Sequence, residues 1–320
     1  MRSLATNIFI ERKYMNTNED TEICIIFTCA GKQERWGNAM GCPKHLVQIK
    51  GQPLLKRNID LACSTFGVSS VYVSIASEEQ RSLYSVDPRI KFFITGTEVQ
   101  CYPALYSVLP LVEKMKGDVI VMLGDVFFSP RCLTTVKEHM REKRAAEPRM
   151  GDIREKRVAE RMGEIREERV AETREERAVE IHIFGRPSEV ENENGHSYGE
   201  LYCFYIPHEK IQDLKEICED VKLQKEQERI RRFAGWEVLA TLSKRYLRET
   251  PIPRNLINTK IPIYRPRGFI PVIKYDWTIE QVLRYGRFPP EVFTTINDET
   301  DDFDLLSDWK NWTQNHPDLV

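Results

Sequence analysis

A loop rich in glycine and basic residues follows the first apolar segment of the chain. Residues 28–46 read TCAGKQERWGNAMGCPKHL and come directly after the apolar run ICIIF. Glycine allows backbone N–H groups to approach phosphate oxygens because no Cβ intervenes. Arg35 can contact two phosphate oxygens at once, and Lys44 supplies a mobile positive charge. The loop is therefore predicted to hold phosphate groups.

Two well-known phosphate-binding loops do not fit this segment. A P-loop ends in Gly-Lys-Ser or Gly-Lys-Thr, whereas this loop ends in Pro-Lys-His. A dinucleotide-binding loop needs the pattern G-x-G-x-x-G, and Gly31, Gly37 and Gly41 do not have that spacing. The sequence thus predicts a longer loop of another class.

Strand and helix patterns alternate around this loop. Apolar, β-branched runs predict strands at residues 23–29, 69–76, 90–94 and 118–123. Helical spacing is found between them, at residues 51–66, 77–84 and 103–115. Such alternation predicts an α/β fold, a Rossmann-like three-layer αβα sandwich with a mixed, mostly parallel sheet. Ligands of such sheets bind beyond the carboxyl ends of the strands, where the loop lies.

The second half of the chain continues this pattern less regularly. Strands are predicted at residues 178–184, 198–206 and 270–276. Residues 208–247 are mostly helical in pattern, and a last helix is predicted near the C-terminus.

A charged repeat separates the two halves. REKRAAE, REKRVAE, REERVAE and REERAVE begin at residues 141, 154, 166 and 174. Residues 141–180 contain no aromatic side chain, and their acidic and basic residues are equal in number. This composition favours a solvated helical or partly disordered insertion, and a homo-oligomer contact is the alternative.

Composition limits the class of protein. The formal net charge of −2 argues against a general nucleic-acid binder, and no apolar run is long enough to span a membrane. Residues 1–21 lack the apolar stretch of a secretory signal and are predicted to be a disordered tail before one domain, residues 22–320. The eight cysteines form no C-x-x-C pair, which favours reduced thiols and a cytoplasmic protein.

Several segments resemble the nucleotidyltransferases, which include sugar-phosphate nucleotidylyltransferases, molybdenum-cofactor guanylyltransferase and the cytidylyltransferases. Four short segments of this chain resemble the first signature of that family. They are Cys-Ala-Gly at 29–31, Arg-Trp-Gly at 35–37, Pro-Lys-His-Leu at 43–46 and Gly-Gln-Pro-Leu at 51–54. DVIVMLGDVFFS, residues 118–129, resembles the central strand of the family, and DETDDFDLLSDW, residues 298–309, resembles its acidic C-terminal segment. The resemblance covers residues 23–140 and 180–312 but not the insertion. Lys32, Gln33 and Glu34 depart from the smaller residues usual before the arginine, and Leu305 and Leu306 replace the usual Thr-Pro.

The resemblance implies roles for individual residues. The backbone of Cys29, Ala30 and Gly31 is expected to contact the nucleotide, and Gln100 to bind an edge of the base. Arg35 and Lys44 are expected to bind the triphosphate and to act as the catalytic residues.

The resemblance also implies a Mg²⁺ site formed by two aspartates. Asp125 ends the central strand, and Asp304 is the match in the C-terminal segment. Asp302 stays open as the alternative, because the two residues alternate along the chain. Two carboxylates together with phosphates and waters are ligands that suit Mg²⁺.

The implied reaction is transfer of NMP from an NTP to a small phosphorylated sugar, alcohol or similar acceptor, with release of pyrophosphate. Glu200 is expected to accept a hydrogen bond from a hydroxyl group of the acceptor. The alternative is that Glu200 is only an exposed strand residue. One alternative is a glycosyltransferase of the related fold, which would use D-x-D where this chain has Gly124-Asp125-Val126. The other is a non-catalytic binding protein on the same scaffold.

Overall fold

The computed structural model describes residues 23–31, 36, 40–84, 87–96, 104–146, 181–186, 200–227, 238–239, 241–242, 292–303 and 306–319. Several predictions lie outside these residues: the N-terminal tail, the insertion from residue 147 to 180, and the strand at residues 270–276. Arg35, Gln100 and Asp304 lie outside them as well.

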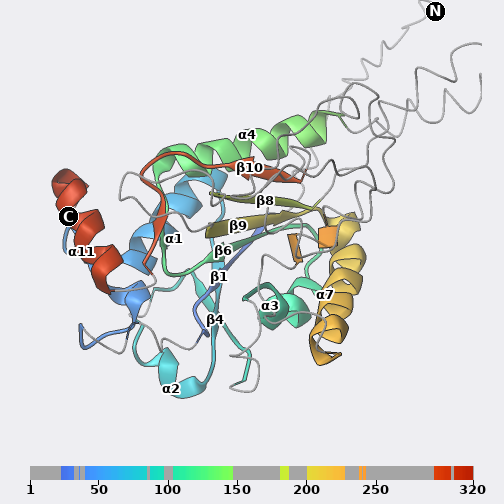
Figure 1. Ribbon diagram of the computed structural model, residues 1–320, viewed down its shortest axis with the longest axis horizontal. Helices are drawn as coiled ribbons and strands as arrows, with labels where there is room; N and C mark the ends of the chain where they lie inside the picture. The colour runs from blue at the N-terminus through green and yellow to red at the C-terminus, as the bar shows by residue number, and fades with distance from the viewer. Residues whose placement is uncertain are drawn as a thin grey trace, which may run out of the picture.

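A seven-stranded sheet, in the order β10-β8-β9-β6-β1-β4-β5, forms the centre of the molecule (Figure 1). Its strands are β1 (Ile23–Thr28), β4 (Val71–Ile75), β5 (Ile90–Ile94), β6 (Asp118–Leu123), β8 (His182–Arg186), β9 (Glu200–Ile206) and β10 (Phe293–Thr295). β9 runs antiparallel to β6 and β8, and the other neighbouring pairs are parallel. The α/β fold with a mixed, mostly parallel sheet confirms the predicted class.

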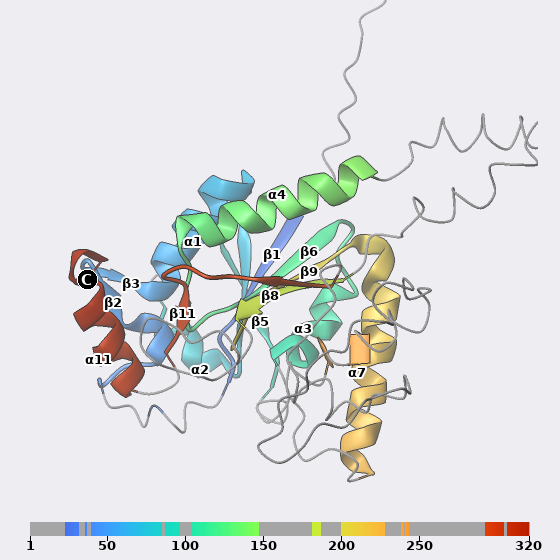
Figure 2. The same cartoon turned by 45° about the horizontal axis from the view of Figure 1, so that its top comes forward.

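Helices cover both faces of the sheet (Figure 2). α1 (Leu54–Phe66) and α4 (Pro130–Ala146) lie on one face, and α3 (Ala104–Val112) and α7 (Ile211–Glu226) lie on the other. In β1, Ile25 and Phe27 belong to the core under α1 and α4, whereas Ile26 belongs to the core under α3 and α7. Successive side chains of a strand point to opposite faces, so the apolar run ICIIF is buried on both sides.

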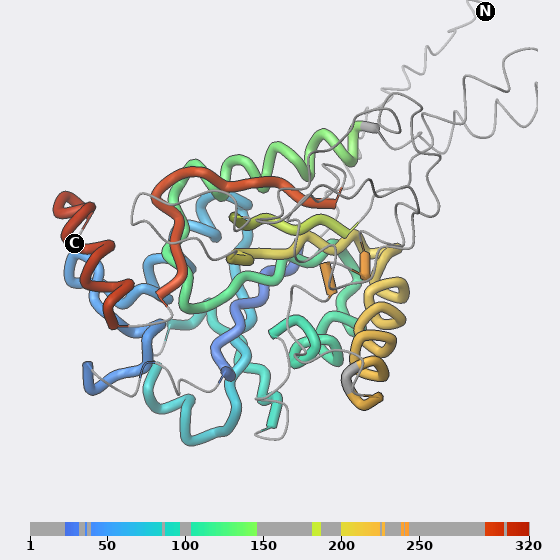
Figure 3. The backbone as a smooth tube through the Cα atoms, viewed as in Figure 1, coloured from blue at the N-terminus to red at the C-terminus, as the bar shows by residue number. Residues whose placement is uncertain are grey.

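A third core, which we call the aromatic cluster, lies beside the sheet. It consists of Trp36, Val47, Ile49, Leu54, Phe127, Phe303, Trp309 and Trp312. These side chains come from the loop after β1, from β2 (Gln48–Ile49), which forms a hairpin with β3 (Gln52–Pro53), from the first residue of α1, from β7 (Val126–Phe127), from the residue after Asp302, and from α11 (Leu306–Asn315). The cluster therefore packs the glycine-rich loop against the C-terminal segment, whose path from β10 to α11 is red in Figure 3.

Short elements complete the described chain. They are η1 (Lys44–Leu46), α2 (Glu78–Arg81), η2 (His208–Lys210), β11 (Asp301–Asp302) and η3 (Pro317–Leu319). The β2–β3 turn has positive φ at both central residues, 50° at Lys50 and 72° at Gly51, as a type I′ hairpin turn requires. No helix among the described residues is long and apolar enough to cross a membrane.

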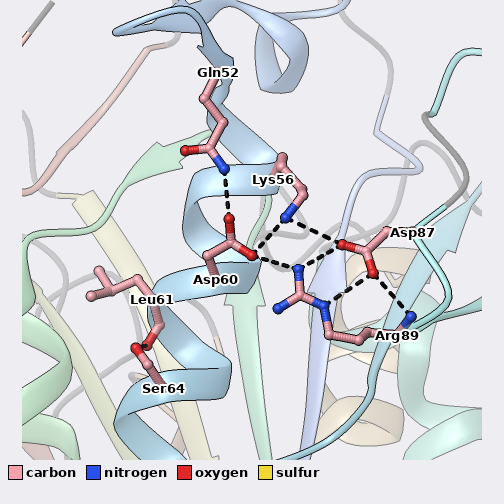
Figure 4. Close-up of polar contacts among 7 residues, drawn as sticks. All are labelled: Gln52, Lys56, Asp60, Leu61, Ser64, Asp87 and Arg89. Atoms are coloured by element: carbon pink, nitrogen blue, oxygen red, sulfur yellow. Dashed lines mark hydrogen bonds and ion pairs between the residues drawn. The ribbon is translucent and has the colours of Figure 1, made fainter.

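A polar network joins α1 to the start of β5 (Figure 4). The Arg89 guanidinium lies 2.5 Å from Asp60 and 2.6 Å from Asp87. Lys56 contacts the same two carboxylates, at 2.6 and 3.4 Å, and the Gln52 amide donates to Asp60 at 2.6 Å. Arg89 thus bridges two carboxylates on a partly exposed surface.

Asp118 fixes the amino-terminal end of β6. Its buried carboxylate accepts hydrogen bonds from the Tyr205 hydroxyl at 2.8 Å and from the backbone N–H of His208 at 3.0 Å. The Arg144 guanidinium of α4 lies 2.7 Å from the same carboxylate. One side chain of β6 thereby contacts α4, β9 and the start of η2.

We expect Asp118→Asn to lower the free energy of unfolding by about 2–4 kcal/mol, because it leaves Arg144 without its charged partner and places an amide against hydrogen-bond donors. Urea unfolding followed by circular dichroism measures this change. Glu78→Gln is the matched control, since its ion pair with Arg81 is exposed and contributes at most about 1 kcal/mol. Equal stability of the two variants would contradict the role given to Asp118.

Candidate functional site

The first signature lies at the carboxyl end of β1. Cys29 and Ala30 are buried, and the Cys29 N–H donates to the carbonyl of Ser74 at 3.0 Å, so that this N–H belongs to the sheet. Gly31 is exposed, and a Cβ built there would meet nothing within 4 Å. The packing of the protein itself therefore does not require glycine at this position, which leaves open space beside the backbone.

Gly124 brings the end of β6 against the end of β1. Its N–H donates to the Thr28 carbonyl at 3.0 Å. A Cβ at Gly124 would lie 2.4 Å from the Cys29 Sγ and 2.8 Å from the Thr28 carbonyl oxygen, so no larger residue fits without displacing backbone. Asp125 follows directly and is thereby placed beside the glycine-rich loop.

Lys44 brings a positive charge to this point. It begins the short helix η1 after Pro43, whose carbonyl accepts the N–H of Leu46 at 2.8 Å. The Lys44 ammonium forms an ion pair with Asp125 and lies 3.9 Å from the Oδ1 of Asp302. Only 13 to 21% of these three side chains is exposed to solvent. One ammonium therefore offsets part of the negative charge of two largely buried carboxylates.

Asp302 reaches this position through β11. This two-residue strand pairs antiparallel with β7, and Asp302 lies opposite Val126. The segment before it is bonded to the start of α4: the Ser129 N–H donates to the Thr300 hydroxyl at 3.0 Å, and the Ser129 hydroxyl contacts Asp298 at 2.7 Å. These contacts place the C-terminal segment directly over the strand that follows Asp125.

Charge interactions set the ionisation of Asp125. Burial raises the pKa of this carboxyl, but the Lys44 ammonium and its hydrogen bond outweigh burial and hold the pKa below its usual value. Asp125 is thus a carboxylate at neutral pH, ready to bind a cation.

His45 lies beneath this pair as an uncharged, buried group. Its Nε2 shares a hydrogen bond of 2.5 Å with the Tyr84 hydroxyl, and the two rings are stacked 5.4 Å apart. Burial lowers the pKa of His45 to about 4, against the attraction of Asp125 and with a smaller lowering from Lys44. His45, the middle residue of η1, therefore anchors this short helix to Tyr84 and adds no charge to the site.

A second charged group lies at the same edge of the sheet. Arg186, which ends β8, contacts Glu200 at 2.7 Å and Asp301 at 3.3 Å, and the Tyr202 hydroxyl donates to Glu200 at 3.2 Å. Burial and the negative charge of Asp301 raise the pKa of Glu200 to about 8, although Arg186 acts in the opposite direction. Glu200 is thus a largely buried member of an ionic group rather than an exposed strand residue.

The structure brings together part of the predicted set. Cys29, Ala30, Gly31, Lys44 and Asp125 meet at one sheet edge, and Asp302 joins them. Glu200 lies at this edge too, in contact with Arg186. Arg35, Gln100 and Asp304 are outside the described residues, so their roles stay predictions.

Sequence reasoning missed Arg186, Asp301, His45 and Tyr84. Arg186 had a usable signal, because it is a charged residue directly after an apolar strand and a glycine. His45 and Asp301 lie within segments that the resemblance had already marked, but nothing in those segments separates them from their neighbours, and Tyr84 carries no local pattern.

The residues present fit a divalent cation. Lys44 and Arg186 face the carboxylates of Asp125, Asp302 and Asp301, whereas Glu200, with its pKa raised to about 8, is mostly protonated at neutral pH, so negative charge is in excess by one. Among the described residues, no three His, Cys, Asp or Glu side chains converge as a complete metal-binding group. Mg²⁺ is commonly bound by one or two carboxylates while phosphates and waters supply its other ligands, which suits Asp125 and Asp302.

A cavity of about 430 Å³ lies on the other side of η1. Its lining is mainly apolar and includes Leu46, Leu55, Ile59, Tyr84 and Trp309. Neither Asp125 nor Asp302 lines it. The charged site at the strand ends is therefore a separate place from this cavity.

His45 is expected to make stability depend on pH. Its pKa is about 4 in the folded protein and about 6.5 when unfolded, so between these values only the unfolded chain binds the proton. The free energy of unfolding should then fall as pH is lowered from 6.5 toward 4, by up to about 1.4 kcal/mol per pH unit from this group. Urea unfolding of the wild type and of His45→Gln over this range measures the difference. Equal slopes of stability against pH would show that His45 is not buried uncharged.

No family model and no curated protein matches the sequence. Comparison with solved structures does find similar chains. A Bacillus anthracis protein described as a glucose-1-phosphate thymidylyltransferase is 10% identical, with 93% of this chain and 97% of that chain covered and a TM-score of 0.47. Rv0371c from Mycobacterium tuberculosis is 14% identical, with 92% and 98% covered and a TM-score of 0.42. CTP:phosphocholine cytidylyltransferase from Streptococcus pneumoniae is 10% identical, with 92% and 98% covered and a TM-score of 0.40. The similar structures thus include nucleotidyltransferases.

Proposed function

We propose that this protein is a nucleotidyltransferase that transfers NMP from an NTP to a small phosphorylated acceptor and releases pyrophosphate. The observation that carries the proposal is the meeting of Lys44, Asp125 and Asp302 at the carboxyl ends of the central strands. In sheets of this kind, ligands bind at that edge. An exposed glycine, Gly31, and a lysine next to two carboxylates are groups that suit a triphosphate with a divalent cation.

The reaction asks the protein mainly to align two anions and to offset the charge between them. The open backbone at Gly31 would lie along the nucleotide, and Lys44, together with Arg35, would contact the phosphates and offset the charge that develops as pyrophosphate leaves. Asp125 and Asp302 would hold Mg²⁺, which when bound supplies positive charge between nucleotide and acceptor oxygens. Asp304, which the sequence predicts as a Mg²⁺ ligand, stays a further candidate.

The acceptor would approach from the Glu200 side. Glu200 and Tyr202 begin β9 at the same edge, next to Asp301 and therefore next to Asp302. A carboxyl group and a hydroxyl group can hydrogen-bond to hydroxyls of a sugar or an alcohol. This arrangement supports an acceptor that carries hydroxyl groups near its phosphate.

Pyrophosphate release, measured with each of the four NTPs against a panel of phosphosugars and alcohol phosphates, tests the proposal. We expect one combination to give metal-dependent turnover. Asp125→Asn and Lys44→Ala should each lower kcat by at least about 100-fold, the scale of losing one charge-stabilising group, while remaining folded. Asp220→Asn, on the exposed face of α7, is the control and should keep full activity. Turnover unchanged in both site variants would refute the assignment.

Lys44 also gives a prediction that needs no substrate. Because its ammonium lies between the two carboxylates, Lys44→Met should strengthen binding of Mn²⁺ to the nucleotide-free protein, by about tenfold if the lost charge interaction is near 1.4 kcal/mol. A titration that follows the electron paramagnetic resonance signal of free Mn²⁺ measures this affinity. Weaker binding in Lys44→Met would mean that the lysine and the cation do not compete for the same carboxylates.

A further inference from the structure

Arg186 is the most buried charged side chain near the site. Only 3% of its surface is exposed, and it bridges Glu200 and Asp301 through one guanidinium nitrogen. Among the described residues, the ion pairs of Arg186 are with Glu200 and Asp301, and not with Lys44 or the proposed metal ligands. Removing an arginine and two carboxylates from water costs free energy. We therefore ask which role of Arg186 at this edge offsets that cost.

The backbone is shaped to aim Arg186 at this point. The pairing of β8 with β9 shifts register between Phe184 and Gly185, directly before the arginine. A Cβ at Gly185 would lie 2.2 Å from the Glu200 carbonyl oxygen, so only glycine allows the close approach. Bulges of this kind redirect side chains and are frequent next to active sites.

Asp301 connects Arg186 to the proposed metal site. In β11, Asp301 and Asp302 are consecutive, and consecutive strand residues point to opposite sides. Asp301 points to Arg186, and Asp302 lies near Lys44. The Asp302 N–H also donates to the Asp301 carboxylate at 3.1 Å. Holding Asp301 therefore fixes the direction of Asp302.

We infer that Arg186 is a positioning residue for the metal site: by gripping Asp301 it aims the Asp302 carboxylate at Asp125. The inference rests on the proposed function, because it requires that Asp125 and Asp302 bind a divalent cation. Arg186 itself touches neither the cation nor the substrate. One terminal nitrogen of its planar guanidinium reaches both carboxylates, and the rigid plane of the group fixes where that nitrogen lies.

Charge and positioning predict opposite results when Arg186 is removed. If the arginine contributes only its positive charge, Arg186→Met makes the site more negative and should bind Mn²⁺ more tightly. If it positions Asp302, the same variant should bind Mn²⁺ more weakly, since residues that orient metal ligands typically affect affinity 10- to 100-fold. The sign of the change thus separates the two roles.

The experiment is a Mn²⁺ titration of the full-length, nucleotide-free protein by electron paramagnetic resonance. We expect Arg186→Met to weaken binding by about tenfold or more, and Arg186→Lys, which keeps the charge but has a shorter side chain without the rigid guanidinium plane, to weaken it as well. Arg89→Met is the matched control, because Arg89 also bridges two carboxylates but lies away from the site. The control should bind Mn²⁺ as the wild type does, and raising the metal concentration should restore turnover of the Arg186 variants.

Each outcome has a distinct meaning. Tighter or unchanged binding in Arg186→Met, or unchanged binding in Arg186→Lys, overturns the positioning role and leaves the proposed function standing. If Arg186→Met fails to fold, Arg186→Lys decides the question, because the net charge stays the same. Absence of saturable Mn²⁺ binding in the wild type overturns the metal site and, with it, this inference.

Discussion

The site depends on one charge interaction, the ammonium of Lys44 between the carboxylates of Asp125 and Asp302. Two carboxylates that are mostly removed from water repel each other and lose hydration, so they cannot share a place without a cation. The lysine supplies that cation from the loop after β1, whereas the aspartates come from the central strand and from the far end of the chain. Three distant parts of the sequence are thus held to a common point by their charges.

Packing makes this meeting geometrically feasible. Gly124 lets the end of β6 lie against β1, and the aromatic cluster joins the loop that leads to Lys44 with the segment that carries Asp302. Trp36 and Trp312, both almost fully buried, donate indole hydrogen bonds to the carbonyls of Cys42 and Glu299 at 3.1 Å. Burial of these large rings contributes the free energy that offsets the cost of ordering two loops.

The strand β11 links two charged groups that would otherwise be independent. Asp301 belongs to the Arg186 group and Asp302 to the Lys44 group, on opposite sides of the same two residues. The two charged groups are therefore joined through one short piece of backbone. Because Glu200 is mostly protonated at neutral pH, one negative charge is in excess at this edge, and a cation complements it.

Local pattern determined the fold and half of the site. Alternating apolar strands and amphipathic helices predicted the parallel layers, and the residues at strand ends, Gly31 and Asp125, met because parallel strands bring their carboxyl ends to one edge. Tertiary structure alone decided that Asp302 lies near Lys44 and that Arg186 holds Asp301. A two-residue strand has no periodicity to read, and a pairing between residues so far apart in the chain is set by packing and charge, which no local stretch of sequence encodes.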